Sequence, residues 1–270
     1  MAALVKTEPR AASAQEWERV GTRESPSWYL DPLVAEQRRR IHQELVWQWT
    51  RGLAIQRVLK TDSFEEAHGN DCILFDLFPR ACSLGMDLSL STARRAQLRS
   101  PNERVRFLVG DVVNLAIRPG SIDAIVSTST LDHLDSRVEL ERAIGQLADV
   151  LRPGGVLVIT LDNPWNPAYA VLRWASHRGW LPFRLGYTAS LSCLTRCLQD
   201  AGLEVTATGA LIHNPRIVST AFFRALRLLL GRRADVPIRA LLAAFAALER
   251  LPTRGFTACF VAACARKPLG

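Results

Sequence analysis

The chain has 270 residues, 48% of them hydrophobic, and a formal net charge of +8 at pH 7. This length and hydrophobic content suffice for one sizeable buried core, so we expect a single domain. The apolar runs are all shorter than the roughly 18 uncharged residues of a membrane span, and the first residues lack the apolar segment of a secretory signal. The positive charge comes mostly from scattered arginines without interleaved aromatic residues, which argues against a nucleic-acid partner.

The six cysteines do not show the spacing of a metal site. Cys193 and Cys197 are one helical turn apart, but no pair of histidines lies near them in the sequence. Buried thiols in a reducing compartment are therefore the expected state, which predicts a cytoplasmic protein without a bound metal.

The N-terminal region divides into two parts. Residues 1–24 are rich in small and charged residues, and we expect a disordered leader there. The domain itself is expected over 25–270. Its first part, 25–56, is predicted to form a helical cap, because apolar residues recur at helical spacing from Leu33 to Trp49.

From residue 57 onward, strand-like and helix-like segments alternate. Seven short apolar runs are candidate strands: Arg57–Lys60, Ala81–Met86, Val105–Val109, Ile122–Ser127, Val156–Leu161, Leu203–Ala210 and Thr257–Ala265. The candidate helices between them are Cys72–Phe78, Ser91–Arg99, Arg137–Leu151 and Ser190–Ala201. This alternation predicts a doubly wound, Rossmann-like α/β fold, with a mostly parallel sheet covered by helices on both faces.

The segment CSLGMDLSLSTARRAQ places an aspartate at the end of the second candidate strand. Asp87 follows Met86, and a helix opens with Ser89 or Ser91 as its N-cap. In doubly wound folds, a carboxylate at this point accepts hydrogen bonds from the ribose hydroxyls of a nucleoside ligand. Taken alone, an aspartate that caps the helix would be the simpler interpretation, but the motifs that follow favour the ligand.

A second aspartate follows the third candidate strand in RFLVGDVVNLAIRPGSIDAIVSTSTLDHL. Asp111 comes directly after Gly110, and the fourth strand begins beside Asp123. The segment LADVLRPGGVLVIT then supplies a helix end, a Pro-Gly-Gly turn and the fifth strand. Each fragment is weak alone, whereas their order and spacing together are specific.

This arrangement resembles the class I S-adenosylmethionine-dependent methyltransferases, particularly the small-molecule type of quinone biosynthesis. The resemblance covers 57–160 by motif and continues through Arg266 by topology. It implies a seven-stranded sheet whose seventh strand is antiparallel and lies beside the fifth. It also implies S-adenosylmethionine as the cofactor, with 57–163 as the cofactor-binding half and 164–270 as the substrate-side half.

The resemblance also assigns roles to residues in the cofactor-binding half. Asp87 would bind the ribose hydroxyls, and Asp111 would bind the adenine amino group. Leu88 and Val112 would line the adenine pocket. Ser127, at the end of the fourth strand, would face the methionine end of the cofactor.

The first loop departs from the family pattern. The segment RVLKTDSFEEAHG has a single glycine, at its last position, where the family has a run of glycines. Glycines let the backbone approach the ligand closely, so a loop without them must swing wider and use side chains to reach it. Lys60 or Thr61 could then reach the methionine carboxylate. Asp62 or Glu65 could reach the ammonium group.

The altered loop bears on the alternatives to a methyltransferase. A dinucleotide-linked oxidoreductase would need a G-x-G-x-x-G cradle for its pyrophosphate, and the chain has none. A non-catalytic binding protein on the same fold stays open, because the altered loop could also reflect lost cofactor binding.

Polar residues after the fourth and fifth candidate strands are candidates for chemistry and substrate contact. His133 could act as a general base towards a hydroxyl group, with Asp132 or Asp135 orienting it, although these residues could equally cap the next helix. The segment after the fifth strand is interpreted as a substrate loop or lid. The expected substrate contacts are Tyr29, Asn163, Trp165 and His213.

Between the sixth and seventh candidate strands, residues 215–251 predict a helical insertion. It contains two apolar helices, Arg216–Leu230 and Pro237–Leu251. The first has a basic amphipathic pattern, which is typical of a helix that rests on a membrane surface or covers an apolar substrate. A cap helix packed on the fold with solvated arginines is the third interpretation.

The sequence as a whole predicts an enzyme that transfers a methyl group from S-adenosylmethionine to a small, apolar molecule. A hydroxyl oxygen is the preferred acceptor, because STST follows the fourth strand in place of the Asn-Pro-Pro-Tyr signature of nitrogen methylation. The alternatives are the non-catalytic binding protein and a methyltransferase that acts at a membrane surface or on a lipid.

Overall fold

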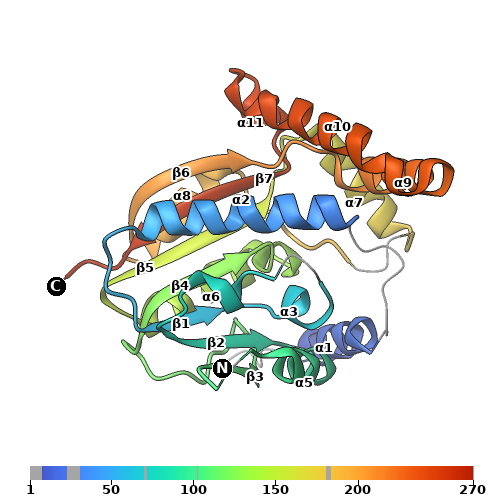
Figure 1. The fold of residues 1–270 in the computed structure, drawn as a ribbon. Helices are drawn as coiled ribbons and strands as arrows, with labels where there is room; N and C mark the ends of the chain where they lie inside the picture. The colour runs from blue at the N-terminus through green and yellow to red at the C-terminus, as the bar shows by residue number, and fades with distance from the viewer. Residues whose placement is uncertain (1–7, 23–30, 70–71, 102, 181–183, 270) are drawn as a thin grey trace.

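The computed structural model describes residues 8–22, 31–69, 72–101, 103–180 and 184–269. One sheet of seven strands runs through the molecule in the order β3-β2-β1-β4-β5-β7-β6 (Figure 1). The strands are β1 (Arg57–Lys60), β2 (Cys82–Asp87), β3 (Val105–Val109), β4 (Ile122–Thr128), β5 (Leu151–Asp162), β6 (Glu204–Leu211) and β7 (Phe260–Arg266). The first five strands are parallel, and β7 is antiparallel to both β5 and β6. The predicted fold class, including the antiparallel seventh strand beside the fifth, is confirmed.

The helices surround this sheet. In chain order they are α1 (Glu8–Gly21), α2 (Pro32–Thr50), α3 (Phe64–His68), α4 (Leu74–Leu77), α5 (Leu90–Arg99), α6 (Arg137–Val150), α7 (Pro167–His177), α8 (Leu191–Asp200), α9 (Arg216–Leu230), α10 (Asp235–Ala247) and α11 (Arg254–Thr257). Short 3-10 turns occur at Leu131–His133, Gly231–Ala234 and Leu248–Arg250. Among the described residues, no helix is both long and apolar enough to cross a membrane.

Each face of the sheet has its own hydrophobic core, because successive side chains of a strand point to opposite faces. On one face, Leu59 and Ile125 pack with residues of α6 and α8. On the other, Val58 and Val126 pack with residues of α2 and α4. Figure 1 shows α2 lying across this second face. This alternation of side chains fixes the register of the strands. Because β1 to β5 are parallel, their carboxyl ends lie at one edge of the sheet, where a ligand would bind.

The ends of several elements differ from the expectation. The segment after β1 contains the short helix α3, and the expected loop after β5 contains α7, whose N-cap Asn166 accepts a hydrogen bond from the Ala168 N–H. β7 begins at Phe260 instead of Thr257, because Arg254–Thr257 forms the helical turn α11.

The prediction of a disordered leader is wrong for Glu8–Gly21, which form helix α1. The end of α1 packs closely on the start of α5. A Cβ atom added at Gly21 would lie 2.4 Å from Ser89 Oγ and 2.5 Å from Thr92 Oγ1. Only glycine allows this close approach.

A carboxylate completes the contact between α1 and α5. Glu18 accepts hydrogen bonds from the hydroxyl groups of Ser89 and Ser91 and from the Ser91 N–H at 3.2 Å. A negative charge is favourable at a helix N-terminus, where unpaired N–H groups point outward. These hydrogen bonds lower the pKa of Glu18, the hydroxyl of Ser91 contributing most. Because these contacts are polar, the sequence of α1 carries no strong apolar stripe that would have predicted a helix.

The insertion between β6 and β7 forms a helical hairpin, α9 and α10, that packs on the start of α2. Phe223, Ile238 and Leu242 bury their side chains against Leu33 and Val34. The first expected helix agrees with α9, whereas the second, expected at Pro237–Leu251, is α10 at Asp235–Ala247, followed by the 3-10 turn Leu248–Arg250.

Candidate functional site

A cavity of about 170 Å³ lies at the carboxyl ends of β1 to β4. It is lined by Ser13, Trp17, Arg38, Thr61, Asp62, Phe64, Glu65, Asp87, Leu88, Thr92, Gly110, Asp111, Val112, Ser129, Thr130, His133, Leu134 and Leu185. A second cavity, beside α2, measures about 10 Å³ and has room for roughly one water molecule. Only the first is large enough for an organic ligand.

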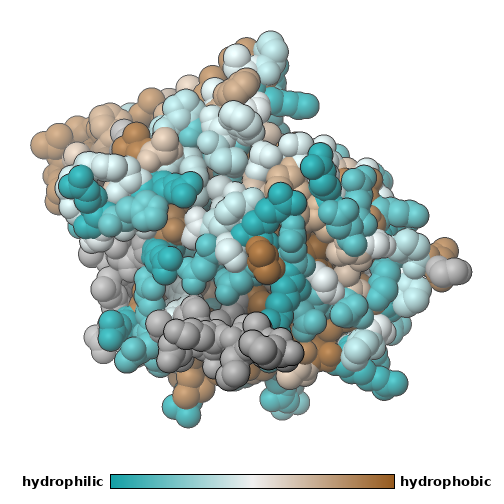
Figure 2. Space-filling model, turned by 180° about the vertical axis from the view of Figure 1, so that it is seen from behind, coloured by the Kyte–Doolittle hydropathy of each residue, from teal (hydrophilic) through white to brown (hydrophobic). Residues whose placement is uncertain are grey.

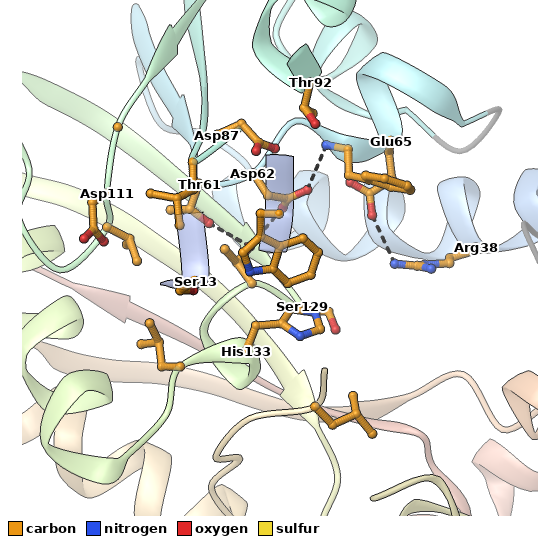
Figure 3. Close-up of a pocket in the computed structure, with 18 residues that line it drawn as sticks. Ser13, Arg38, Thr61, Asp62, Glu65, Asp87, Thr92, Asp111, Ser129 and His133 are labelled. Atoms are coloured by element: carbon orange, nitrogen blue, oxygen red, sulfur yellow. Dashed lines mark hydrogen bonds and ion pairs between the residues drawn. The ribbon is translucent and has the colours of Figure 1, made fainter. Parts of the chain in front are cut away.

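Asp87 leaves the tip of β2 and points into the cavity (Figure 3). Its two oxygens accept hydrogen bonds from the backbone N–H groups of Ser89, at 2.8 Å, and Ser63, at 3.0 Å. These bonds orient the carboxylate and join the loop after β1 to the tip of β2. Burial raises the pKa of Asp87 to about 6, although both N–H groups act to lower it.

Asp111 leaves the tip of β3 on the same side of the cavity. Its Oδ1 accepts a hydrogen bond from the Val113 N–H at 3.0 Å, and the Gly110 N–H donates to the Asp87 carbonyl at 2.9 Å. The two strand tips are thus joined through their backbones. Val112, which is 8% exposed, lines the cavity beside Asp111, and Leu88 lines it beside Asp87.

Lys60, at the end of β1, is not among the residues that line the cavity. Its side chain is 0% exposed, and its Nζ lies 3.2 Å from Asp62, 3.0 Å from Glu65 and 2.9 Å from Glu66. Burial by itself would lower the pKa of Lys60, but the three carboxylates outweigh it and raise the pKa well above its usual value. The expectation that Lys60 reaches a ligand carboxylate is therefore wrong, because its charge is already neutralised inside the protein.

The carboxylates around Lys60 have different environments. Glu66 is buried and accepts hydrogen bonds from the backbone N–H groups of Ile73 and Leu74. Asp62 and Glu65 line the cavity. We refer to Lys60, Asp62, Glu65 and Glu66 as the β1 charge cluster.

Arg38 on α2 joins the β1 charge cluster from outside the sheet. Its guanidinium lies 3.2 Å from Glu65 Oε1, and it also lines the cavity (Figure 3). Burial would raise the pKa of Glu65, but the charge of Lys60, a hydrogen bond with Asp62 and then the charge of Arg38 hold it well below its usual range. Burial and the nearby charge of Glu65 raise the pKa of Asp62. Glu65 is therefore the carboxylate that stays ionised.

Hydroxyl groups connect the ends of β1 and β4. Thr61 Oγ1 lies 2.9 Å from both Ser127 Oγ and Thr130 Oγ1, and Thr130 Oγ1 donates to Asp62 at 2.9 Å. Ser127 was expected to face the ligand, but it is fully buried and does not line the cavity. It instead supports Thr61 through their hydrogen bond. Ser129 lines the cavity with a φ of 52°, a left-handed backbone conformation that is rare for serine and often found at functional sites.

His133 lines the cavity at the wall opposite the strand tips. Its Nδ1 lies 2.9 Å from the carbonyl of Arg184. A carbonyl only accepts hydrogen bonds, so Nδ1 carries the proton and Nε2 is the acceptor nitrogen of the neutral ring.

Asp132 does not orient His133, contrary to the expectation. It is 1% exposed, and its Oδ2 accepts hydrogen bonds from Ser129 Oγ at 2.9 Å and from the Asp162 N–H at 2.8 Å. Asp132 therefore supports Ser129 and the end of β5. Asp135, the other candidate, forms an ion pair with Arg184 at 2.9 Å.

Helix α1 supplies a wall of the cavity that the sequence did not indicate. Ser13 and Trp17 both line the cavity. The Trp17 ring packs edge-on against His133, with ring centroids 4.9 Å apart. A tryptophan in a segment without helical periodicity gave no signal of this role.

The residues expected to contact a substrate lie elsewhere. Asn163 is buried and donates to the carbonyls of Gly255 and Ala258. His213 is 6% exposed, with its Nδ1 2.9 Å from Thr257 Oγ1. Trp165 is 63% exposed, and none of these three lines the cavity. Tyr29 is outside the described residues.

Comparison with known proteins gives a consistent match. Residues 69–159 match the family model described as "Methyltransferase domain". A probable S-adenosylmethionine-dependent methyltransferase of Mycolicibacterium smegmatis is 27% identical over 152 residues, which cover 55% of this chain and 52% of that protein. An uncharacterised methyltransferase of Mycobacterium tuberculosis is 31% identical over 80 residues, 29% of this chain and 39% of that protein. The matched region thus spans only 39% to 52% of these relatives' own length.

Among solved structures, the N-methyltransferase NodS of Bradyrhizobium japonicum, in complex with S-adenosyl-L-homocysteine, has a similar fold. Its TM-score is 0.58 at 16% identity, with 95% of this chain and 98% of that chain covered. The family match begins at Gly69, directly after the glycine-free part of the first loop. Residues 69–159 thus match a methyltransferase domain, and the order of the sheet with its antiparallel β7 is that of the class I S-adenosylmethionine-dependent methyltransferase fold, with carboxylates at the tips of β2 and β3.

Proposed function

We propose that this protein binds S-adenosylmethionine in the cavity at the carboxyl ends of β1 to β4 and transfers its methyl group to a small, apolar acceptor at a hydroxyl oxygen. The observation that carries the proposal is the pairing of Asp87 and Asp111 at adjacent strand tips, both lining one cavity of about 170 Å³. The cofactor supplies an activated methyl group on a sulfonium. The protein must hold the reactants in line and keep water away.

The adenosine end is assigned to the tips of β2 and β3. Each oxygen of Asp87 accepts one backbone N–H and keeps a lone pair for a ribose hydroxyl. Asp111 would accept the adenine amino group, while Leu88 and Val112 would pack on the ring.

The methionine end is assigned to the end of β1. Ionised Glu65, together with Asp62, would bind the ammonium group, and Arg38 would bind the carboxylate. Ionised Glu65 and the guanidinium of Arg38 match the two charges of an amino acid. Thr61, which also lines the cavity, would add a hydroxyl. Side chains thus take the place of the backbone contacts that a glycine-rich loop would make.

The acceptor would lie between the sulfonium and His133. The acceptor nitrogen of the ring, Nε2, would remove the hydroxyl proton as the new bond forms. Leu134, Leu185 and Trp17 line this part of the cavity, which favours an apolar acceptor.

Calorimetric titration with S-adenosylhomocysteine tests the binding site. Asp87→Asn is expected to weaken binding by about 100-fold or more, because two hydrogen bonds to a charged group are lost. Asp111→Asn is expected to weaken it about tenfold. The control Asp149→Asn changes an exposed aspartate on α6 and should leave affinity unchanged. Thermal melting would show that each variant is folded; a folded wild-type protein with no heat of binding at millimolar ligand would overturn the proposal.

Radiolabelled methyl transfer from S-adenosylmethionine to a small-molecule extract tests the catalytic step. His133→Asn keeps a donor towards the Arg184 carbonyl but removes the base. The rate should fall by about 100-fold or more while the affinity for S-adenosylhomocysteine stays within a few-fold. An unchanged rate would remove His133 from the mechanism, and tight cofactor binding without any transfer would favour a non-catalytic binding protein.

A further inference from the structure

The turn between α9 and α10 carries large apolar side chains that face outward. Leu228 is 87% exposed, Leu229 is 81% exposed and Val236 is 76% exposed, with Leu230 beside them at 44%. We refer to these four residues as the hairpin tip. Figure 2 shows hydrophobic side chains along the arm that projects at the upper left of that view, which is the end of the molecule that carries α9 and α10 in Figure 1.

The packing of the hairpin on the fold does not use these side chains. Phe223, Ile238 and Leu242 form the buried contacts with α2. Arg227 adds ion pairs to Asp31 at the start of α2 and to Asp235 at the start of α10. The hairpin is therefore already held in place by its inner face, and the tip is left for another contact.

The charge around the tip is positive. Between Leu228 and Ile238 the chain contains Arg232 and Arg233, against the acidic residue Asp235. Asp235 is paired with Arg227. Arg232 and Arg233 are exposed and directly follow the leucines of the tip in the sequence.

The positive charge distinguishes between two partners for the hairpin tip, a second copy of the chain and an anionic lipid surface. In a symmetric dimer formed by the two tips, Arg232 and Arg233 of both copies would come together. An anionic lipid surface would instead neutralise the arginines while its acyl region received the leucines. The tip also projects outward, as a side chain that enters a bilayer must.

We propose that the hairpin tip docks the protein on a membrane whose headgroups are anionic, with Leu228 and Leu229 entering the interfacial region and Arg232 and Arg233 binding lipid phosphates. Each arginine near such a surface adds about fivefold in partitioning, from about 1 kcal/mol per charge. The side chains of Leu228 and Leu229, once inserted among the lipids, strengthen the partitioning further. The proposal is independent of methyl transfer and goes beyond it.

Co-sedimentation of the full chain with vesicles tests the proposal. The probes are vesicles of phosphatidylcholine alone and vesicles with 30% phosphatidylglycerol. We expect binding to the anionic vesicles that is at least tenfold stronger and that weakens in 0.5 M salt, which screens charges beyond about 4 Å. Arg232→Glu with Arg233→Glu should abolish it, and Leu228→Ser with Leu229→Ser should reduce it at least tenfold.

Matched controls separate the tip from the general charge and apolarity of the surface. Leu98→Ser changes a leucine on α5 that is also 87% exposed. Arg94→Glu with Arg106→Glu reverses two exposed arginines on α5 and β3. Both should bind vesicles like the wild type. Equal losses in the controls, or no partitioning of the wild type, would overturn the proposal.

Two further outcomes identify another occupant. If the wild type is a dimer in solution and the leucine variant is a monomer, the tip is an interface between copies and the proposal fails. If the leucine variant keeps full vesicle binding and a soluble polyanion such as heparin displaces the wild type completely, the site recognises charge alone and the proposal also fails.

Discussion

The two sides of the cavity hold their carboxylates in different ways. At the tips of β2 and β3, Asp87 and Asp111 accept hydrogen bonds from nearby backbone N–H groups. At the end of β1, Asp62 and Glu65 are held by the buried Lys60, and Glu65 is also paired with Arg38 from α2.

The difference shows what replaces a glycine-rich loop. Backbone contacts need only the correct turn, whereas a cluster of buried charges needs every partner, because each unpaired charge in the interior costs several kcal/mol. Gly85 on the neighbouring strand makes room for Ser63 in the loop after β1 and for the ring of Phe107. A Cβ atom there would lie 2.9 Å from Ser63 Oγ and 2.4 Å from the ring of Phe107. The loop after β1 has no glycine that allows a close backbone approach, but Gly85 on the neighbouring strand β2 allows one.

The largest effect should follow from breaking the β1 charge cluster at its centre. Lys60→Met removes the cation that Asp62, Glu65 and Glu66 share, leaving Glu65 with Arg38 alone, and should lower the free energy of unfolding by about 3–5 kcal/mol, as measured by urea denaturation. Adding Glu66→Gln to Lys60→Met removes one buried charge and should recover part of the loss. A loss below about 1 kcal/mol would mean that the cluster does not hold the loop.

The functional division of the cavity can be tested with two ligands. S-adenosylhomocysteine has an amino-acid end, and 5′-methylthioadenosine lacks it. Glu65→Gln and Arg38→Gln should each weaken the first ligand about tenfold or more, since each loses a charged hydrogen bond, and leave the second unchanged. Asp87→Asn should weaken both. If Glu65→Gln weakened both ligands equally, the assignment of the methionine end to β1 would be wrong.

The pH dependence of ligand binding should report the ionisation of Asp87 at the tip of β2. The pKa of Asp87 is about 6, raised by burial, and only the ionised form accepts both ribose hydroxyls. The affinity for 5′-methylthioadenosine should therefore fall as the pH drops below about 6, by roughly tenfold at pH 5. Asp87→Asn should abolish this dependence.

The same pKa predicts the opposite trend for stability. A carboxyl whose pKa is higher in the folded than in the unfolded state binds protons more strongly when folded, so its contribution stabilises the fold as the pH falls from above 6 towards 4. Urea denaturation of the wild type and Asp87→Asn across this range would measure the contribution. If the wild type lost both its ligand affinity and the Asp87-dependent part of its stability as the pH fell, the assignment of a raised pKa to Asp87 would be wrong.

The smallest effect is expected at α1, which closes the cavity. Glu18→Gln weakens the attachment of α1 to the start of α5, so the affinity for S-adenosylhomocysteine should fall by a few-fold. Limited proteolysis should cleave within α1 faster in the variant. Glu16→Gln, a neutralised glutamate on the same helix, is the control; equal cleavage of the two variants would exclude a specific role for Glu18.

Much of the fold could be predicted because its signals are local. Short apolar runs, helical periodicity and turn residues defined the seven strands, and the resemblance supplied their order. Asp87 and Asp111 stood out because a carboxylate directly after a buried strand is visible in the sequence. Thr61, Asp62 and His133 were named from the same kind of position, and all three line the cavity.

The residues that were missed depend on contacts between distant segments. Glu18 reaches Ser89 across 71 positions of the chain, and Asp132 reaches the Asp162 N–H across 30. Arg38 gave no signal either, because it lies on a helix whose apolar pattern only predicts packing. Asn163 and His213 were named for their polarity, but they hydrogen-bond to the segment before β7.

The strands, their faces and the two carboxylates at the ends of β2 and β3 follow from local sequence patterns, because they depend on neighbouring residues and on the two-residue period of a strand. The burial of Lys60 and the role of α1 depend instead on contacts between distant segments of the folded chain. Whether a charged side chain points inward or into a cavity depends on which opposite charges surround it, and here Glu65 and Glu66 come from α3 while Arg38 comes from α2. The balance between desolvation and pairing is set by these contacts, and no local pattern in the sequence encodes it.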